Sequence, residues 1–131
     1  MKSLILAGPM IASLISFSGA QAAPPTSAAL FAENCAACHQ PKGEGIAGAF
    51  PALAKNAFVK GDPKVVAATI LNGRGGMPSF RSDLSDAEIA AVLTFVRASW
   101  GNKAVPVTPV VVASARSAKV AEGPRKIMQA H

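Results

Sequence analysis

A single pentapeptide, Cys35-Ala36-Ala37-Cys38-His39, restricts the folds open to this chain more than any other stretch. C-x-x-C-H is the covalent attachment signature of a c-type haem. A helical turn places Cys35 and Cys38 on one face, where both thiols can form thioethers with the porphyrin, and His39 follows where an imidazole nitrogen can ligate the iron. The pentapeptide uses both cysteines and one of the two histidines of the chain, and it predicts one covalent haem c.

Three other kinds of site can be built from the same cysteines. A structural zinc site needs four Cys or His ligands, usually in two clusters, and the other candidate ligand here is His131 at the extreme C-terminus. A thioredoxin-like dithiol accompanies a β-α-β pattern, and the sequence offers no convincing pair of strands. A plain Cys35–Cys38 disulfide is the remaining alternative in an oxidising compartment. The haem site is the interpretation that uses the cysteines and His39 together.

The N-terminal residues 1–23 are predicted to be a secretory signal peptide. A lysine precedes a short apolar run at 4–17, and Ala-Gln-Ala at 20–22 has the small-x-small pattern of a cleavage site. The run is shorter than the roughly 20 apolar residues of a membrane span, so we expect cleavage after Ala22 or Ala23 rather than a retained anchor. Membrane contact would then be peripheral at most. This leader predicts a periplasmic protein, because bacteria attach haem covalently outside the cytoplasm.

The charge distribution argues against nucleic acid as a partner. The formal net charge of the whole chain is +6. Residues 24–104 contain eight basic and six acidic residues, whereas residues 105–131 contain four basic residues and one acidic residue. The sequence has no basic stripe interleaved with aromatic residues, and it has no tyrosine. The predicted folded domain, 24–104, is therefore nearly balanced, and the C-terminal segment is basic.

Local signals predict one helix before and one after a long loop. Thr26 or Ser27 caps a first helix that runs into the haem motif. Residues 40–60, rich in glycine, proline and lysine, are predicted to form the loop. Asp62 followed by proline then begins a second helix, which ends at Gly73.

A third predicted helix shows the clearest periodicity in the chain. A capping box at 85–88 begins it, apolar residues recur at helical spacing from Ile89 to Trp100, and Gly101 ends it. Residues 105–131 lack such a period and are predicted to be a flexible basic tail, with docking to an acidic partner or an anionic membrane as the alternative. Three short helices bury little apolar surface, so a haem would supply the missing core.

The sixth ligand of the iron decides between two functions. Met77 lies in a glycine-rich loop between the second and third predicted helices, and thioether sulfur is a suitable axial ligand. We expect His39 and Met77 to ligate the iron, which leaves outer-sphere electron transfer and predicts an electron carrier rather than an enzyme. If Met77 instead fills a gap in the core, a five-coordinate haem would bind small gases or reduce peroxide. The predicted folded region has no second histidine to assist peroxide chemistry.

Residues 26–104 resemble a class I c-type cytochrome of the small monohaem bacterial kind. The resemblance rests on CAACH at 35–39 and on the stretches at 48–53, 73–80 and 96–102. It implies an all-α cytochrome c fold, with three to five short helices wrapped round one covalent haem. The first and last helices would cross, with Phe31 meeting Leu93 and Val96. The last stretch is similar to cytochrome subunits of periplasmic dehydrogenases.

The resemblance also implies roles for single residues and partners. The Pro51 carbonyl would accept the Nδ1–H of His39 and fix its tautomer. Arg74 and Trp100 would contact a propionate or the haem, unless Arg74 is a solvated loop residue and Trp100 packs in the core. A periplasmic dehydrogenase would donate electrons to the protein, which would be a free carrier or its cytochrome subunit. A terminal oxidase or another cytochrome would accept them.

Overall fold

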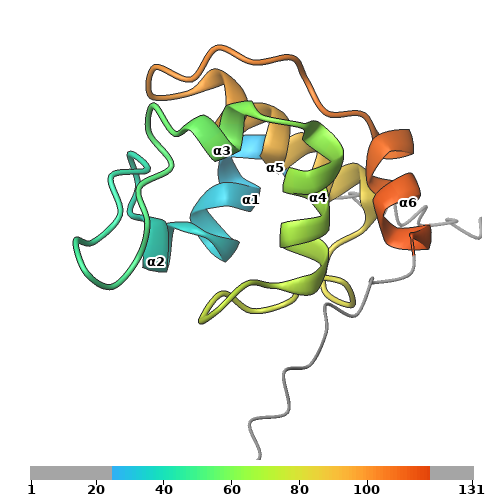
Figure 1. Ribbon diagram of the computed structural model, residues 1–131, viewed down its shortest axis with the longest axis horizontal. Helices are drawn as coiled ribbons and strands as arrows, with labels where there is room; N and C mark the ends of the chain where they lie inside the picture. The colour runs from blue at the N-terminus through green and yellow to red at the C-terminus, as the bar shows by residue number, and fades with distance from the viewer. Residues whose placement is uncertain (1–24, 119–131) are drawn as a thin grey trace, which may run out of the picture.

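The computed structural model describes residues 25–118, and the predicted signal peptide lies outside this part of the chain. The described residues form six helices and no strand (Figure 1). The helices are α1 (Ser27–Asn34), α2 (Ala36–His39), α3 (Ala57–Lys60), α4 (Pro63–Asn72), α5 (Asp86–Ala98) and α6 (Pro109–Ser117). No helix among residues 25–118 is long and apolar enough to cross a bilayer. The all-α prediction is confirmed, and one helix more is present than the largest number predicted.

The three predicted helices begin where their capping residues stand. Thr26 Oγ1 accepts a hydrogen bond from the amide of Ala29, and Asp62 Oδ1 accepts one from the amide of Lys64 at 2.7 Å. Ser85 and Glu88 form a complete capping box at the start of α5. Each of these caps satisfies amide groups that a helix N-terminus leaves without a partner. These helix starts are confirmed. They could be predicted because the residues that set them lie next to the helix in the sequence.

One additional helix and one helix end differ from the prediction. The loop predicted at 40–60 contains the single turn α3, which Asn56 caps by accepting a hydrogen bond from the amide of Val59. Helix α5 ends at Ala98 rather than at Gly101. The hydroxyl of Ser99 donates to the carbonyl of Phe95 at 2.6 Å, and such side-chain bonds compete with continuation of the helix.

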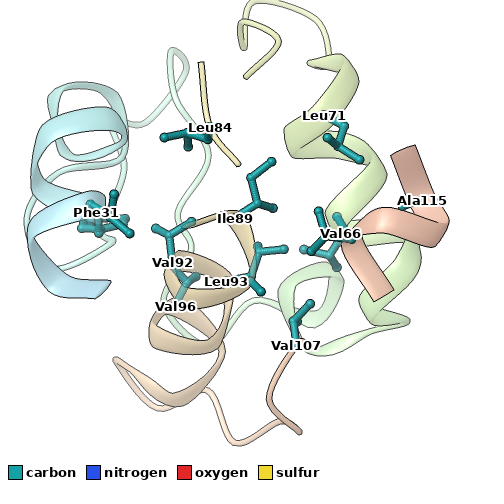
Figure 2. Packing of buried hydrophobic residues seen from close by; sticks show 14 of the residues in the cluster. Phe31, Val66, Leu71, Leu84, Ile89, Val92, Leu93, Val96, Val107 and Ala115 are labelled. Carbon is teal, nitrogen blue, oxygen red and sulfur yellow. The ribbon is translucent and has the colours of Figure 1, made fainter. Parts of the chain in front are cut away.

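The buried core lies where α1 and α5 pack together and continues toward α4 (Figure 2). The ring of Phe31 lies 4.9 Å from the ring of Trp100 and 5.7 Å from that of Phe95, measured between centroids. Leu93 and Val96, the neighbours predicted for Phe31, lie in the same buried cluster. The crossing of the first and last predicted helices is therefore built around three aromatic rings.

The prediction of a flexible tail is wrong for residues 105–118. Thr108 caps α6, and this helix packs against both α4 and α5 (Figure 1). Val112 is fully buried, and Val107 and Ala115 are 4% and 3% exposed. The helix has only nine residues and a narrow apolar face, so its sequence shows no sustained period and the packing surface decides its structure. Residues 119–131 of the predicted tail lie outside the described residues.

Candidate functional site

The haem motif lies at a sharp break between two helices. Cys35 is at once the residue that ends α1 and the residue that precedes α2, and the amide of His39 donates to the Cys35 carbonyl at 2.9 Å. Cys35 and Cys38 are both free thiols and both partly exposed, so the disulfide alternative is not formed in this structure. Burial, with a smaller contribution from Cys38, raises the pKa of the Cys35 thiol to about 11. Because the two sulfur atoms are not bonded to each other, both are available for thioether bonds.

The imidazole of His39 is held from one side. Its Nδ1 lies 2.9 Å from the carbonyl oxygen of Pro51, and the ring is 9% exposed. A carbonyl oxygen can only accept, so Nδ1 donates in this bond, and in the neutral ring the lone pair is then on Nε2. Within residues 25–118 the ring forms no other hydrogen bond, so Nε2 has no partner there. Since no fully buried side-chain nitrogen or oxygen in this part of the chain lacks a partner, Nε2 is not fully buried. Nε2 is therefore open to a metal ion that approaches from outside.

The contact with Pro51 is the one that the resemblance implied, while its role beside iron remains a prediction. The structure gives no support to the zinc alternative. In the described part of the chain no three His, Cys, Asp or Glu side chains are grouped so that they could hold a metal ion. His131, the fourth ligand that a zinc site would need, lies outside that part.

The loop that carries Pro51 is folded back on the haem motif through Gly43. The Gly43 carbonyl accepts hydrogen bonds from the amides of Leu53 and Ala54, at 2.7 and 2.9 Å. Gly43 has a φ of +64°, and a Cβ at this position would lie 2.5 Å from Cε3 of Trp100. The indole thus packs directly on the Gly43 backbone as well as on the aromatic cluster. These contacts account for Trp100 as a packing residue, and contact with the haem remains a prediction.

Asn102 is a site-positioning residue that the sequence analysis missed. It is 2% exposed, and its Nδ2 donates to the carbonyls of Leu53 and Val96, each at 2.9 Å. Its Oδ1 accepts from the amide of Asn56 at 3.0 Å. The side chain joins the end of α5 to the segment just after Pro51. An asparagine after a glycine indicates only a turn, so the sequence carries no signal for this long-range role.

Arg97 is a second residue that was missed. Its guanidinium is buried and donates to the carbonyls of Val59 at 2.6 Å, Gly61 at 2.9 Å and Val105 at 2.9 Å. Burial lowers the pKa of Arg97, and the negative charge of Asp62 opposes this effect. Arg97 follows Leu93 by four residues and so lies on the apolar face of α5, which was the available signal.

Met77 lies at a tight turn in the loop between α4 and α5 and is partly buried. Its amide donates to the Arg74 carbonyl at 3.0 Å, and the Arg74 amide donates back to the Met77 carbonyl at 3.2 Å. Gly73 has a φ of +72°, and a Cβ there would lie 2.5 Å from the Met77 carbonyl oxygen. In the view of Figure 1 this loop swings back beneath α1, toward the side where α2 lies.

Arg74 is exposed but does not lie free in solvent. Its guanidinium carbon lies 5.2 Å from the ring centroid of Phe58, within the range of a cation–π interaction. The contact links the Met77 turn to α3. Contact of Arg74 with a propionate remains a prediction.

Large apolar side chains are left exposed along the segment that follows the haem motif. Among them Ile46, Phe50 and Phe58 are 43%, 38% and 39% exposed. A shallow hollow of about 410 Å³ is lined by Glu44 and residues 46–52, beside the haem motif rather than formed by it. Free thiols, an open Nε2 and uncovered apolar side chains together fit a large apolar cofactor bound through His39.

Comparisons with known proteins agree with this fit. Residues 22–96 match the family model described as cytochrome C oxidase, cbb3-type, subunit III. Over 89 residues the chain is 36% identical to the cytochrome c subunit of alcohol dehydrogenase (quinone) from Gluconobacter oxydans (strain 621H), which is 59% of this chain and 19% of that protein. It is 41% identical over 70 residues to cytochrome c6 of Leptolyngbya boryana, covering 51% of this chain and 81% of that protein. It is 36% identical over 85 residues to cytochrome c-552 of Thermus thermophilus, covering 53% of this chain and 64% of that protein. The chain therefore spans about a fifth of the dehydrogenase subunit it matches.

Proposed function

Because this chain belongs to the family of c-type cytochromes described as cytochrome C oxidase, cbb3-type, subunit III, we propose that His39 and Met77 are the axial ligands of its haem iron. The resemblance to class I c-type cytochromes is confirmed, and with it the covalent haem c cofactor and the role in electron transfer. The similar proteins are named as cytochromes c or as cytochrome c subunits of dehydrogenases, and we propose that this chain likewise carries electrons and is not itself an enzyme. The axial ligands, the compartment and the partners are our proposals.

The proposal depends most on the environment of His39. Its Nδ1 is held 2.9 Å from the Pro51 carbonyl, the two free thiols precede it within four residues, and large apolar side chains of the following segment are left exposed. Pro51 keeps the ring in one tautomer and orientation, so Nε2 presents its lone pair without rearrangement. Cys35 and Cys38 would hold the haem through thioether bonds. The haem supplies a one-electron Fe(III)/Fe(II) couple.

Met77 is proposed as the second ligand because its loop is stiff and near the surface. The paired hydrogen bonds with Arg74 and the close packing of Gly73 restrict the turn that carries it. A preformed turn presents the thioether at little cost in conformational entropy. A site filled on both sides has no position for substrate, which favours outer-sphere transfer over gas binding or peroxide reduction.

We further propose that the protein works in the periplasm after removal of residues 1–23. A dehydrogenase would reduce it, and an oxidase or another cytochrome would oxidise it. Support comes from the names of similar proteins, among them a cytochrome c subunit of gluconate 2-dehydrogenase from Pantoea cypripedii, 34% identical over 105 residues. Whether this chain is a free carrier or a bound subunit is decided by which partner co-purifies with it.

Optical spectra of the matured protein test the ligand assignment. The oxidised wild type should show the sulfur-to-iron charge-transfer band, and the reduced wild type should not respond to carbon monoxide. Met77→Ala should remove the band and allow carbon monoxide to bind. Met128→Ala is the matched control, because Met128 is the other methionine that follows the predicted leader. If the wild type lacks this band and its reduced form binds carbon monoxide, the haem is instead five-coordinate.

A further inference from the structure

The loop that carries Met77, residues 73–80, is closed at its two ends by side chains. Nη2 of Arg81, the residue after the loop, donates to Oδ1 of Asn72, the residue before it, at 2.9 Å. A second bond joins the loop to α4, since the hydroxyl of Ser79 donates to the carbonyl of Leu71 at 2.6 Å. We call the Arg81–Asn72 pair the neck of the loop. The neck holds both ends of the loop at the end of α4.

Through its Arg116, helix α6, which lies later in the chain, forms hydrogen bonds with Arg81. Nη1 of Arg116 donates to the carbonyl of Arg81 at 2.5 Å, and Nη1 of Arg81 donates back to the carbonyl of Arg116 at 3.1 Å. Nε of Arg116 pairs with Oδ1 of Asp86 at 2.7 Å, and Nη2 donates to the carbonyl of Leu84 at 3.0 Å. The two side chains thus hold each other's backbone.

The pairing of Arg116 with Asp86 is the one salt bridge within residues 25–118. It is partly shielded, since the two side chains are 27% and 32% exposed. An arginine is required for this arrangement, because its planar fork reaches a carboxylate and two carbonyls in fixed directions. A lysine could keep the ion pair but not all three contacts.

Apolar packing already accounts for the position of α6. Val112 is fully buried and Ala115 is 3% exposed, so the helix has its own anchor against α4 and α5. The bonds of Arg116 instead end on the three residues where the chain leaves the methionine loop and enters α5. They therefore act on the loop more than on the helix that carries them.

We propose that Arg116 is a positioning residue that, through Arg81, keeps the neck closed and holds Met77 on the iron. This inference depends on the proposed function, because it requires Met77 to be the ligand. An external ligand can take the place of Met77 only when the loop opens. Its apparent affinity therefore reports the fraction of molecules with an open loop. Loss of the hydrogen bonds of Arg116 raises that fraction.

The test uses the oxidised holoprotein and imidazole as the external ligand. For Arg116→Gln we expect imidazole to bind about tenfold more tightly than to the wild type, as loss of a charge-assisted hydrogen bond would produce. Arg81→Gln removes the neck hydrogen bond and the one to the carbonyl of Arg116 but keeps the side chain of Arg116, and it should have a similar effect. The affinity of Arg116→Lys for imidazole should lie between that of Arg116→Gln and that of the wild type. Ile89→Val, in the core of α5, is the control for global destabilisation, with unfolding followed by circular dichroism for every variant.

The possible results separate the two proposals. Tighter imidazole binding by both glutamine variants and wild-type affinity for Ile89→Val support the positioning role. If the wild type shows the charge-transfer band but Arg116→Gln and Arg81→Gln bind imidazole no better than Ile89→Val, the positioning role is wrong and Met77 ligation stands. If the wild type has no such band, ligation by Met77 and its positioning by Arg116 are both wrong.

Discussion

The substitution Asn102→Asp tests how the turn after α5 holds the segment next to Pro51. Asn102 is 2% exposed and makes three hydrogen bonds, one as acceptor from the amide of Asn56 and two as donor to the carbonyls of Leu53 and Val96. Aspartate has almost the same shape. The change therefore keeps the acceptor and replaces the donor by an oxygen that faces two carbonyl oxygens at about 2.9 Å.

We expect a loss of unfolding free energy that is larger at neutral pH than in acid. The ionised carboxylate is a buried charge without a partner, which costs about 3–5 kcal/mol. The protonated form can donate to one carbonyl, which leaves a loss of about 1–3 kcal/mol. Burial raises the folded-state pKa of the introduced carboxyl above its unfolded value of about 4. The additional loss therefore develops as the pH rises from about 4 through that raised pKa.

Chemical denaturation of the holoprotein, followed by circular dichroism at both pH values, measures the effect after subtraction of the wild type. Asn102→Ala is the control, because it leaves the same three groups without partners at every pH. Its loss relative to the wild type should not depend on pH. A loss for Asn102→Asp that is equal in acid and at neutral pH would refute the assignment of Nδ2 as a buried donor.

Three further changes test other contacts. Arg97→Met leaves three carbonyls unpaired and should lower the unfolding free energy by about 2 kcal/mol in chemical denaturation, and wild-type stability would contradict this. Hydrogen bonds from the side chain and backbone of Ser85 lower the pKa of Glu88, so their stabilisation is lost as the pH falls through that lowered pKa. Glu88→Gln should flatten the acid side of a plot of stability against pH, and an unchanged acid limb would argue against the capping role. Gly43→Ala would place a methyl group 2.5 Å from Trp100, so Tm should fall and the near-UV circular dichroism of the single tryptophan should change, whereas an unaltered spectrum would disprove the contact.

Much of the helical framework could be predicted because its signals are local. Thr26, Asp62 and the capping box at Ser85 each act on amides within three residues, so reading the sequence in order finds them. The haem motif is local for the same reason, since five consecutive residues contain both thiols and the imidazole. Helix α6 escaped prediction because its two buried residues, Val112 and Ala115, have meaning only against the surface of α4 and α5.

The sequence by itself determined the cofactor chemistry and the starts of the main helices, because groups close together along the chain decide both, and its resemblance to class I c-type cytochromes supplied the class of fold. Only the tertiary structure decided what surrounds that chemistry. The carbonyl that orients His39 comes from Pro51, twelve residues later, and the arginine that holds the exit of the methionine loop lies 35 residues after Arg81. Neither partner carries a signal in its own neighbourhood. A hydrogen bond between distant segments forms only when the packed core brings its donor and acceptor within 3 Å of each other.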